Sequence, residues 1–240
     1  FGDGTVSAND CFRPVSRYFD RITRPEQIVP ALMRAMAVLT DPAECGPVTL
    51  SLCQDVQAEA FDYPESFFEE RLWLPRRQRP DEHELQAAVE ALRKAKAPLI
   101  VSGGGTLYSG ASAALEVLAG KSGIPVTETQ GGKSSLPDGN PLNMGAIGVT
   151  GTSAANQLAE KADVVLAVGT RFQDFTTGSW ALFRNPDKII IGLNVQPFDA
   201  FKHSALPLVA DARAGLTELA EHLGGWAAPK AWTDKARKGK

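Results

Sequence analysis

Cysteine and histidine are scarce in this chain, and their spacing argues against two kinds of site. The 240 residues include three cysteines and three histidines. No two cysteines form a C-x-x-C pair and no two histidines stand at i,i+4, so neither a redox pair nor a zinc site is indicated. An odd number of unpaired thiols favours a reducing compartment, so we expect a cytoplasmic protein in which Cys11, Cys45 and Cys53 stay reduced.

Long apolar runs and an excess of positive charge are also lacking. No run approaches the about 20 residues of a membrane-spanning helix, and no basic segment followed by an apolar one opens the chain. The 25 Lys and Arg residues face 28 Asp and Glu residues and are dispersed, apart from a short basic tail at residues 235–240. We therefore expect neither a membrane nor a nucleic acid as partner. Because the chain opens at Phe1 rather than at a methionine, we expect a piece of a longer protein.

Three signatures of nucleotide-binding or catalytic sites are missing as well. The dinucleotide pattern G-x-G-x-x-G that could begin at Gly103 fails because Tyr108 holds the third glycine position. The P-loop pattern G-x-x-x-x-G-K-[ST] does not occur. No G-x-S-x-G is present, so a hydrolase triad of that kind has no nucleophile.

The sequence does contain an alternation of helix-like and strand-like segments. Apolar residues at helical spacing predict helices at about residues 25–39, 81–96, 110–122, 151–161 and 211–223. Short apolar runs predict strands at about residues 47–56, 98–104, 125–129, 163–168, 188–193 and 206–210. This alternation is typical of an α/β fold with a doubly wound parallel sheet. We expect a partial α/β domain at residues 1–60, a linker at 61–80, a Rossmann-like domain at 81–225 and a linker or tail at 226–240.

Glycine-rich loops follow several of the predicted strands. They are residues 103–105, 131–133, 145–151 and 169–172. Backbone amides without side chains can approach a pyrophosphate near a helix N-terminus. From the residues alone, a nucleotide contact and a plain turn are equally good interpretations of these loops. Arg171 and Asp174 could similarly clamp a phosphate and a hydroxyl, or form a local salt bridge.

Several of these segments together resemble a known enzyme family. They read, in chain order, GPVTLSLCQDV, APLIVSGGG, SGIPVTET, MGAIGVTGTSAAN, ADVVLAVGTRF and ADAR. This order is similar to that of the thiamine-diphosphate-dependent enzymes of the acetolactate synthase superfamily, over nearly the whole chain. NDCFRPVSRYFDRITRPEQ and QDVQAEAFDYP resemble one branch more closely, the hydrolases of inositol catabolism that open a cyclic 1,2-diketone. The GDG at residues 2–4 has the first letters of the superfamily's metal motif, but it lacks the flanking strand and asparagine, so we interpret it as a loop.

The resemblance implies a place for this chain within a larger enzyme. It would hold the end of a pyrimidine-binding domain, joined to a central domain. Thiamine diphosphate would attack a ring carbonyl of the diketone, and water would complete carbon–carbon cleavage to a deoxy-glucuronic acid. In the family, the cofactor-activating glutamate and the Mg²⁺ ligands lie in other parts of the polypeptide. The resemblance therefore places no catalytic residue and no metal ligand here, and it implies a homo-oligomer and a piece that is inactive alone.

The resemblance also bears on a second cofactor. In flavin-binding relatives, FAD contacts the residues that match Gly103, Gly104, Gly105, Met144, Gly145, Gly148, Gly169, Arg171 and Phe172. Asn194 and Gln196 stand where those relatives usually have an acidic residue, and Val149-Thr150 replaces a histidine. We therefore expect no FAD, and we expect the glycine loops to serve mainly in packing. Two alternatives stay open: an acetolactate-synthase-like carboligase that holds FAD, and a stand-alone nucleotide-binding module.

Overall fold

The computed structural model describes residues 5–240, and the chain divides into two compact units between Arg76 and Arg77. The GDG at residues 2–4 lies outside the described residues. No helix in the described part of the chain is long and apolar enough to cross a lipid bilayer.

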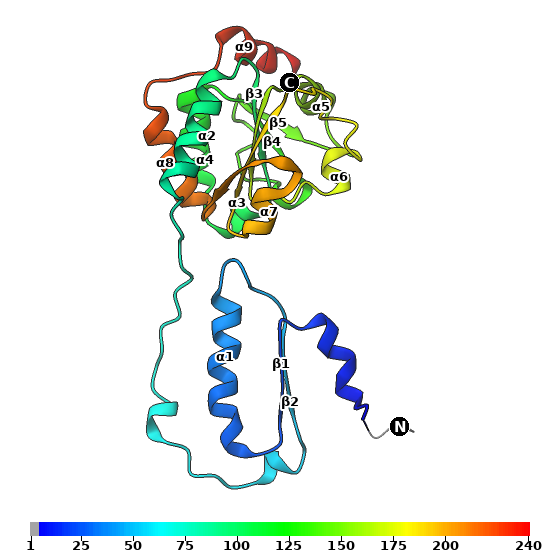
Figure 1. The fold of residues 1–240 in the computed structure, drawn as a ribbon, viewed down its shortest axis with the longest axis vertical. Coiled ribbons are helices and arrows are strands. Elements are labelled where there is room, and N and C mark those ends of the chain that lie inside the picture. The colour runs from blue at the N-terminus through cyan, green and yellow to red at the C-terminus, as the bar shows by residue number, and fades with distance from the viewer. Residues whose placement is uncertain (1–4) are drawn as a thin grey trace. The chain divides into compact units, whose positions relative to one another are not determined.

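The first unit is a β-α-β arrangement (Figure 1). Strand β1 (Tyr18–Ile22) pairs in parallel with β2 (Val48–Leu52), and helix α1 (Ile28–Thr40) connects them. Short 3-10 turns complete the unit: η1 (Ala8–Val15), η2 (Pro25–Gln27), η3 (Val56–Ala58) and η4 (Glu65–Phe67).

The buried core of the first unit is small. It consists of Ile22, Ala31 and Val56, with a few partly buried neighbours. Helix α1 has 13 residues and one charge, Arg34, yet its buried residues are only Ala31 and Ala35. Helices that are apolar on all sides are normally buried, and parallel strands are normally covered on both faces. The first unit therefore leaves apolar surface that further polypeptide could cover.

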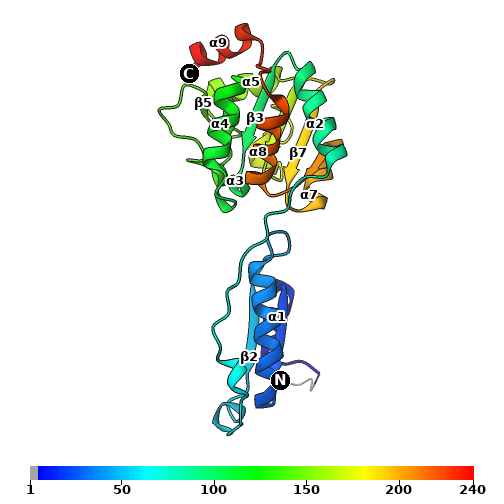
Figure 2. The same ribbon diagram turned by 90° about the vertical axis from the view of Figure 1, so that its left-hand side faces the viewer.

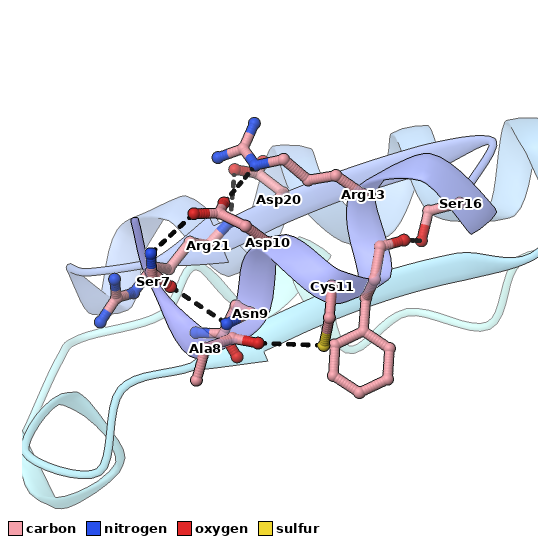
Figure 3. Close-up of polar contacts among 10 residues, drawn as sticks. Ser7, Ala8, Asn9, Asp10, Cys11, Arg13, Ser16, Asp20 and Arg21 are labelled. Carbon is pink, nitrogen blue, oxygen red and sulfur yellow. Dashed lines mark hydrogen bonds and ion pairs between the residues drawn. The ribbon is translucent and has the colours of Figure 1, made fainter. Parts of the chain in front are cut away.

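The turn η1 is held by a capping box (Figure 3). The N–H of Asn9 donates to Ser7 Oγ at 3.1 Å, and the N–H of Ser7 donates to Asp10 Oδ2 at 2.7 Å. The bond from the Ser7 backbone, together with one from Arg13, lowers the pKa of the Asp10 carboxyl. These contacts fix the start of the described chain.

Six parallel strands form the sheet of the second unit (Figure 1). They are β3 (Pro98–Ser102), β4 (Val126–Glu128), β5 (Asn143–Ala146), β6 (Val164–Val168), β7 (Ile189–Asn194) and β8 (Leu206–Val209). Their order in space is β5-β4-β3-β6-β7-β8, with Pro98 opposite Val164 and Val164 opposite Ile189. The chain builds outward from β3 to one edge and then from β6 to the other, which confirms the predicted doubly wound sheet.

Helices cover both faces of this sheet, because successive side chains of each buried strand point to opposite sides. Helices α2 (Glu82–Lys94), α4 (Ser112–Ser122) and α8 (Ala212–Leu223) lie together on one face (Figure 2). Helix α5 (Ser153–Lys161) lies on the other. Short elements follow the strand ends: α3 (Gly104–Tyr108), η5 (Gln130–Gly132), α6 (Asp174–Thr177), α7 (Pro197–Phe201) and η6 (Lys202–Ser204).

Residues 226–240 differ from the expected linker or tail. They form helix α9 (Lys230–Gly239), whose Trp232 is buried and donates from Nε1 to the carbonyl of Pro98 at 2.9 Å. Thr233 also donates, from Oγ1 to the carbonyl of Gly123 at 2.8 Å. This segment therefore packs on the second unit at the start of β3. Its apolar residues are too few among lysines and arginines to give a clear helical pattern in the sequence.

The predicted linker at residues 61–80 divides between the two units. Its aromatic half packs on itself in the first unit, where the rings of Tyr63 and Phe67 stack at 5.6 Å. From Arg77 onward the chain is fixed to the second unit. Arg77 Nη1 lies 2.8 Å from the buried carboxylate of Asp211, and the N–H of Asp211 donates to the carbonyl of Gln78. The same carboxylate caps α8.

Candidate functional site

The carboxyl ends of β3 and β6 form the switch point of the sheet, where doubly wound folds commonly bind ligands. The structure brings three of the candidate loops together there: Gly103–Gly105 after β3 and Gly169–Phe172 after β6 at the switch point itself, and residues 131–133 after β4 beside Gly104. Gly145 and Gly148 lie farther out, in and after the edge strand β5.

The two loops at the switch point touch through their backbones. A Cβ atom on Gly103 would lie 2.7 Å from Cβ of Thr170 and would overlap the carbonyl oxygen of Gly169. A Cβ atom on Gly105 would lie 2.6 Å from Cα of Gly169. Glycine is required here because any side chain would separate the loops. Gly103 and Gly105 thus allow the loops after β3 and β6 to pack directly on each other.

Hydrogen bonds also engage the amides of most candidate glycines. Gly103 N–H donates to the carbonyl of Val168, Gly105 N–H to that of Gly169, and Gly169 N–H to that of Leu193, at 2.7 to 3.0 Å. The N–H groups of Gly145 and Gly148 donate to the side-chain oxygens of Asn143 and Asn156. A phosphate would have to displace these partners, so the five amides do not form a prepared anion site.

The loop after β5 is held by its neighbours. Gly148 has φ +108°, which side chains rarely adopt, and its backbone is bonded at both N–H and carbonyl by the Asn156 amide. The next amide, Val149 N–H, donates to the carbonyl of Phe175 at 2.8 Å. Helix α5 and the segment at α6 therefore fix this loop.

Phe172 and Arg171 have different surroundings. The Phe172 ring is buried and packs edge-on to the rings of Phe183 and Trp180, with centroids 5.2 and 6.1 Å apart. Arg171 and Asp174 are both exposed, and no ion pair joins these two described side chains. The local salt bridge is therefore absent, whereas Arg171 is accessible to solvent.

A cluster of strained backbone surrounds Phe172. Five residues with side chains have positive φ there: Phe172, Ser179, Trp180, His203 and Ser204. The ring of His203 lies 4.4 Å from that of Trp180. Burial lowers the pKa of His203, the charge of Lys202 acts in the same direction, and a hydrogen bond with the Arg171 backbone opposes them. Such strain persists only where surrounding contacts hold it.

Asn194, at the end of β7, makes a contact that the sequence did not predict. Its Nδ2 donates to the carbonyl of Thr170 at 3.4 Å, and its Oδ1 accepts from the N–H of Gln196 at 3.0 Å. A carboxylate could not donate to that carbonyl. The asparagine therefore ties the end of β7 to the loop after β6.

Metal-ligating side chains do not cluster in the part of the chain that the structure describes. No group of three or more His, Cys, Asp or Glu residues among them is placed to hold a metal ion. Two shallow depressions lie elsewhere, one of about 410 Å³ between α4 and α8 and one of about 320 Å³ beside β5 and the start of α5. Met144 and Gly145 line the second, and the other candidate glycines line neither.

Comparison with known proteins identifies the class to which this arrangement belongs. Residues 85–219, more than half of the chain, match the family described as thiamine pyrophosphate enzyme, central domain. The matched segment runs from α2 to α8 and so covers all six strands of the sheet. The chain belongs to this family.

Two curated proteins that are similar to this chain carry the same name. The chain is 49% identical over 224 residues to the 3D-(3,5/4)-trihydroxycyclohexane-1,2-dione hydrolase of Geobacillus thermodenitrificans, a match that covers 93% of this chain and 35% of that enzyme. It is 44% identical over 236 residues to the enzyme of the same name from Clostridium tetani. That match covers 98% of this chain and 37% of that enzyme. The chain thus spans about a third of the length of these relatives.

A solved structure has the same fold. It is an enzyme from Mycobacterium smegmatis, provisionally assigned to the thiamin diphosphate-dependent class. It aligns with a TM-score of 0.73 at 24% identity, over 92% of this chain and 42% of its own length.

Proposed function

We propose that this chain is part of a thiamine-diphosphate-dependent hydrolase that cleaves a carbon–carbon bond of trihydroxycyclohexane-1,2-dione. The observation that carries the proposal is the extent of the similarity to the hydrolases of that name. Identities of 44–49% extend over 93–98% of this chain and so include both units, well beyond the family match at residues 85–219.

Within that enzyme, the second unit would act as a structural domain that spaces the catalytic parts. The backbone contacts at Gly103, Gly105 and Gly169 support this role, because they use the space and the amides that a cofactor would need. We assign thiamine diphosphate and Mg²⁺ mainly to polypeptide outside residues 1–240. The chain itself would hold no FAD and no catalytic group.

The proposal extends to organisation and location. Residues 1–60 would complete a pyrimidine-binding domain and residues 81–225 would form the central domain. The free cysteines of the described chain agree with a cytoplasmic enzyme. Homo-oligomers would form, since cofactor sites of this class lie between domains of different subunits. No nucleic acid or membrane takes part.

The direct test is an assay of the longer polypeptide that carries this segment. With thiamine diphosphate, Mg²⁺ and the dione, we expect formation of the ring-opened acid, and we expect residues 1–240 alone to give no turnover above a blank. Turnover by residues 1–240 alone would contradict the structural role. If the preparation instead binds a yellow flavin and joins pyruvate molecules, the hydrolase proposal is rejected in favour of a carboligase.

A matched pair of variants tests whether the exposed arginine contributes to chemistry. In the longer polypeptide, Arg171→Ala removes the accessible cation at the switch point, and Arg237→Ala removes an exposed cation on α9. We expect neither to change kcat by more than about twofold, because surface changes away from the reacting groups have small effects. A large loss of kcat in Arg171→Ala alone would place a catalytic group in this chain.

A further inference from the structure

The chain contains two Asp-Gly pairs, and one of them lies on an exposed turn of the second unit. The pairs are residues 3–4, which lie outside the described residues, and Asp138-Gly139. The N–H of Asn140 donates to the carbonyl of Pro137 at 2.9 Å and so closes a turn around the second pair. Both central residues of the turn are exposed. The carboxyl group of Asp138 is therefore open to solvent beside a residue without a side chain.

The backbone nitrogen of Gly139 is accessible. No hydrogen bond of the described chain engages its N–H, and a Cβ atom at this position would meet no other atom within 4 Å. Asp187, which is also exposed and precedes Lys188, offers a comparison. There the following N–H donates to the carbonyl of Asn185 at 3.4 Å, and the residue that carries it has a side chain. Of these two exposed aspartates, only Asp138 is followed by an unhindered nitrogen.

Lys240 brings a positive charge to the same turn. Its Nζ donates to the carbonyl oxygens of Asp138 and Asn140, each at 2.9 Å. The Asp138 carbonyl belongs to the peptide group that contains the Gly139 nitrogen. When this nitrogen loses its proton, negative charge spreads onto the carbonyl oxygen, and a donor already placed there stabilises that charge. Lys240 therefore makes the Gly139 nitrogen easier to convert into a nucleophile.

We propose that Asp138 is a site of spontaneous conversion to isoaspartate, promoted by Lys240. The Gly139 nitrogen attacks the side-chain carboxyl carbon of Asp138 and forms a C–N bond. The hydroxyl group of the carboxylic acid leaves with the N–H proton as water, which closes a five-membered succinimide ring. Water then adds to the backbone carbonyl carbon of Asp138 and breaks its bond to the Gly139 nitrogen. The chain now runs through the former side chain, and the former backbone carbonyl is a free carboxylate. Water is the only co-reactant.

The conversion changes the contacts of the turn, because it adds one methylene group to the backbone. Asn140 Nδ2 donates to Glu116 Oε1 of α4 at 3.3 Å, and Lys240 connects the turn to the end of α9. A longer backbone displaces the atoms that make these bonds. Asp138 and Lys240 also line the depression of about 320 Å³ beside β5. We therefore expect this depression to change shape in aged protein.

Ageing of the longer polypeptide tests the proposal. The protein is kept folded at physiological pH and temperature, or unfolded in urea, and its peptides are then separated and identified by mass spectrometry. Isoaspartate is recognised by a shifted retention time at unchanged mass, and by resistance to an endoproteinase that cleaves before aspartate. In the folded protein we expect isoaspartate at position 138 in several-fold higher yield than at position 187.

A pair of lysine variants tests the role of the charge. Lys240→Met should slow the conversion at position 138 several-fold in the folded protein. In urea it should have no effect, because Lys240 no longer lies on the turn. Lys121→Met removes an exposed charge from the last turn of α4 and should leave the rate unchanged in both states.

Three outcomes would overturn the proposal. Isoaspartate no more abundant at position 138 than at position 187 would reject the site. Equal rates for the folded protein and its Lys240→Met variant would reject the role of the lysine. A matching loss in Lys121→Met would show a general effect of charge and would reject that role as well. The proposal does not depend on the proposed hydrolase, so an inactive preparation would leave each of these outcomes as informative as an active one.

Discussion

The two units of this chain differ most in how completely they bury their apolar residues. In the second unit, both faces of a six-stranded sheet are covered, and strands such as β3 and β6 are buried along their whole length. In the first unit, an apolar helix and two strands share a core of three buried residues. Burial of apolar surface is the dominant favourable term in folding. We therefore expect the second unit to fold as an independent domain, and the first to need further polypeptide for stability.

The largest expected effect comes from separating the units. We expect residues 77–240 to unfold in one cooperative thermal transition, followed by far-UV circular dichroism, and residues 1–76 to show none. A two-stranded sheet is at best marginally stable in water, and the small core adds little. A sharp transition for residues 1–76 would show that the first unit is stable without further polypeptide.

Two leucine-to-alanine substitutions in the whole chain compare how much buried side chains stabilise each unit. Leu166→Ala removes a fully buried side chain in β6, so we expect a loss of about 3–5 kcal/mol in the free energy of unfolding. Leu32→Ala acts on a partly exposed position of α1 and should cost no more than about 1 kcal/mol. Urea denaturation measures both losses. Equal losses would mean that the first unit has a core of its own.

A pair of glycine substitutions tests the contact at the switch point. Gly103→Ala forces a methyl group against Gly169 and Thr170, and overpacking of this kind costs about 1–3 kcal/mol. Gly120→Ala, in α4, meets open space and should stabilise by about 0.5–1 kcal/mol through helix propensity. Unfolding midpoints of residues 77–240 would reveal opposite shifts. A loss in both variants would point to an effect of the methyl group other than the loop contact.

The smallest effect concerns pH and His203. Because the folded-state pKa of His203 is lowered, the unfolded state binds more protons near pH 6.5 and below. The second unit should therefore lose stability as the pH falls from about 7 through the lowered pKa, and only slightly, since the residue is exposed. His203→Asn, which tolerates the left-handed backbone, should reduce this loss. An unchanged pH dependence in the variant would show that other groups cause it.

The sequence predicted the elements with strong periodicity and missed those defined by contacts. Continuous apolar runs identified β6 and β7 to within about one residue and β3 to within about two residues. The short strand β5 (Asn143–Ala146) escaped because its residues show no alternation and its place depends on pairing with β4. Helix α9 escaped because hydrogen bonds from the buried Trp232 and Thr233, together with the small Ala236, hold it in place of a broad apolar face.

The site shows a similar division. Glycines at strand ends were recognisable from spacing alone, yet their two interpretations could not be separated. The distinction depends on which backbone atoms approach Gly103 and Gly105, and Gly169 lies more than sixty residues away in sequence. The contact of Asn194 with Thr170 also could not be predicted without the fold. An asparagine in place of an acidic residue changes no hydrophobic pattern in the sequence, and nothing in the sequence shows which carbonyl the side chain reaches.

The buried carboxylate of Asp211 has a consequence for how the linker leaves the second unit. It pairs with Arg77 just before α2 and also begins α8, so one side chain joins the entry of the chain to the last helix on the sheet. Residues 77 and 78 are thereby held to the second unit by an ion pair and a backbone hydrogen bond, whatever the composition of the segment before them. Loss of this carboxylate would release that attachment and uncap α8 at the same time.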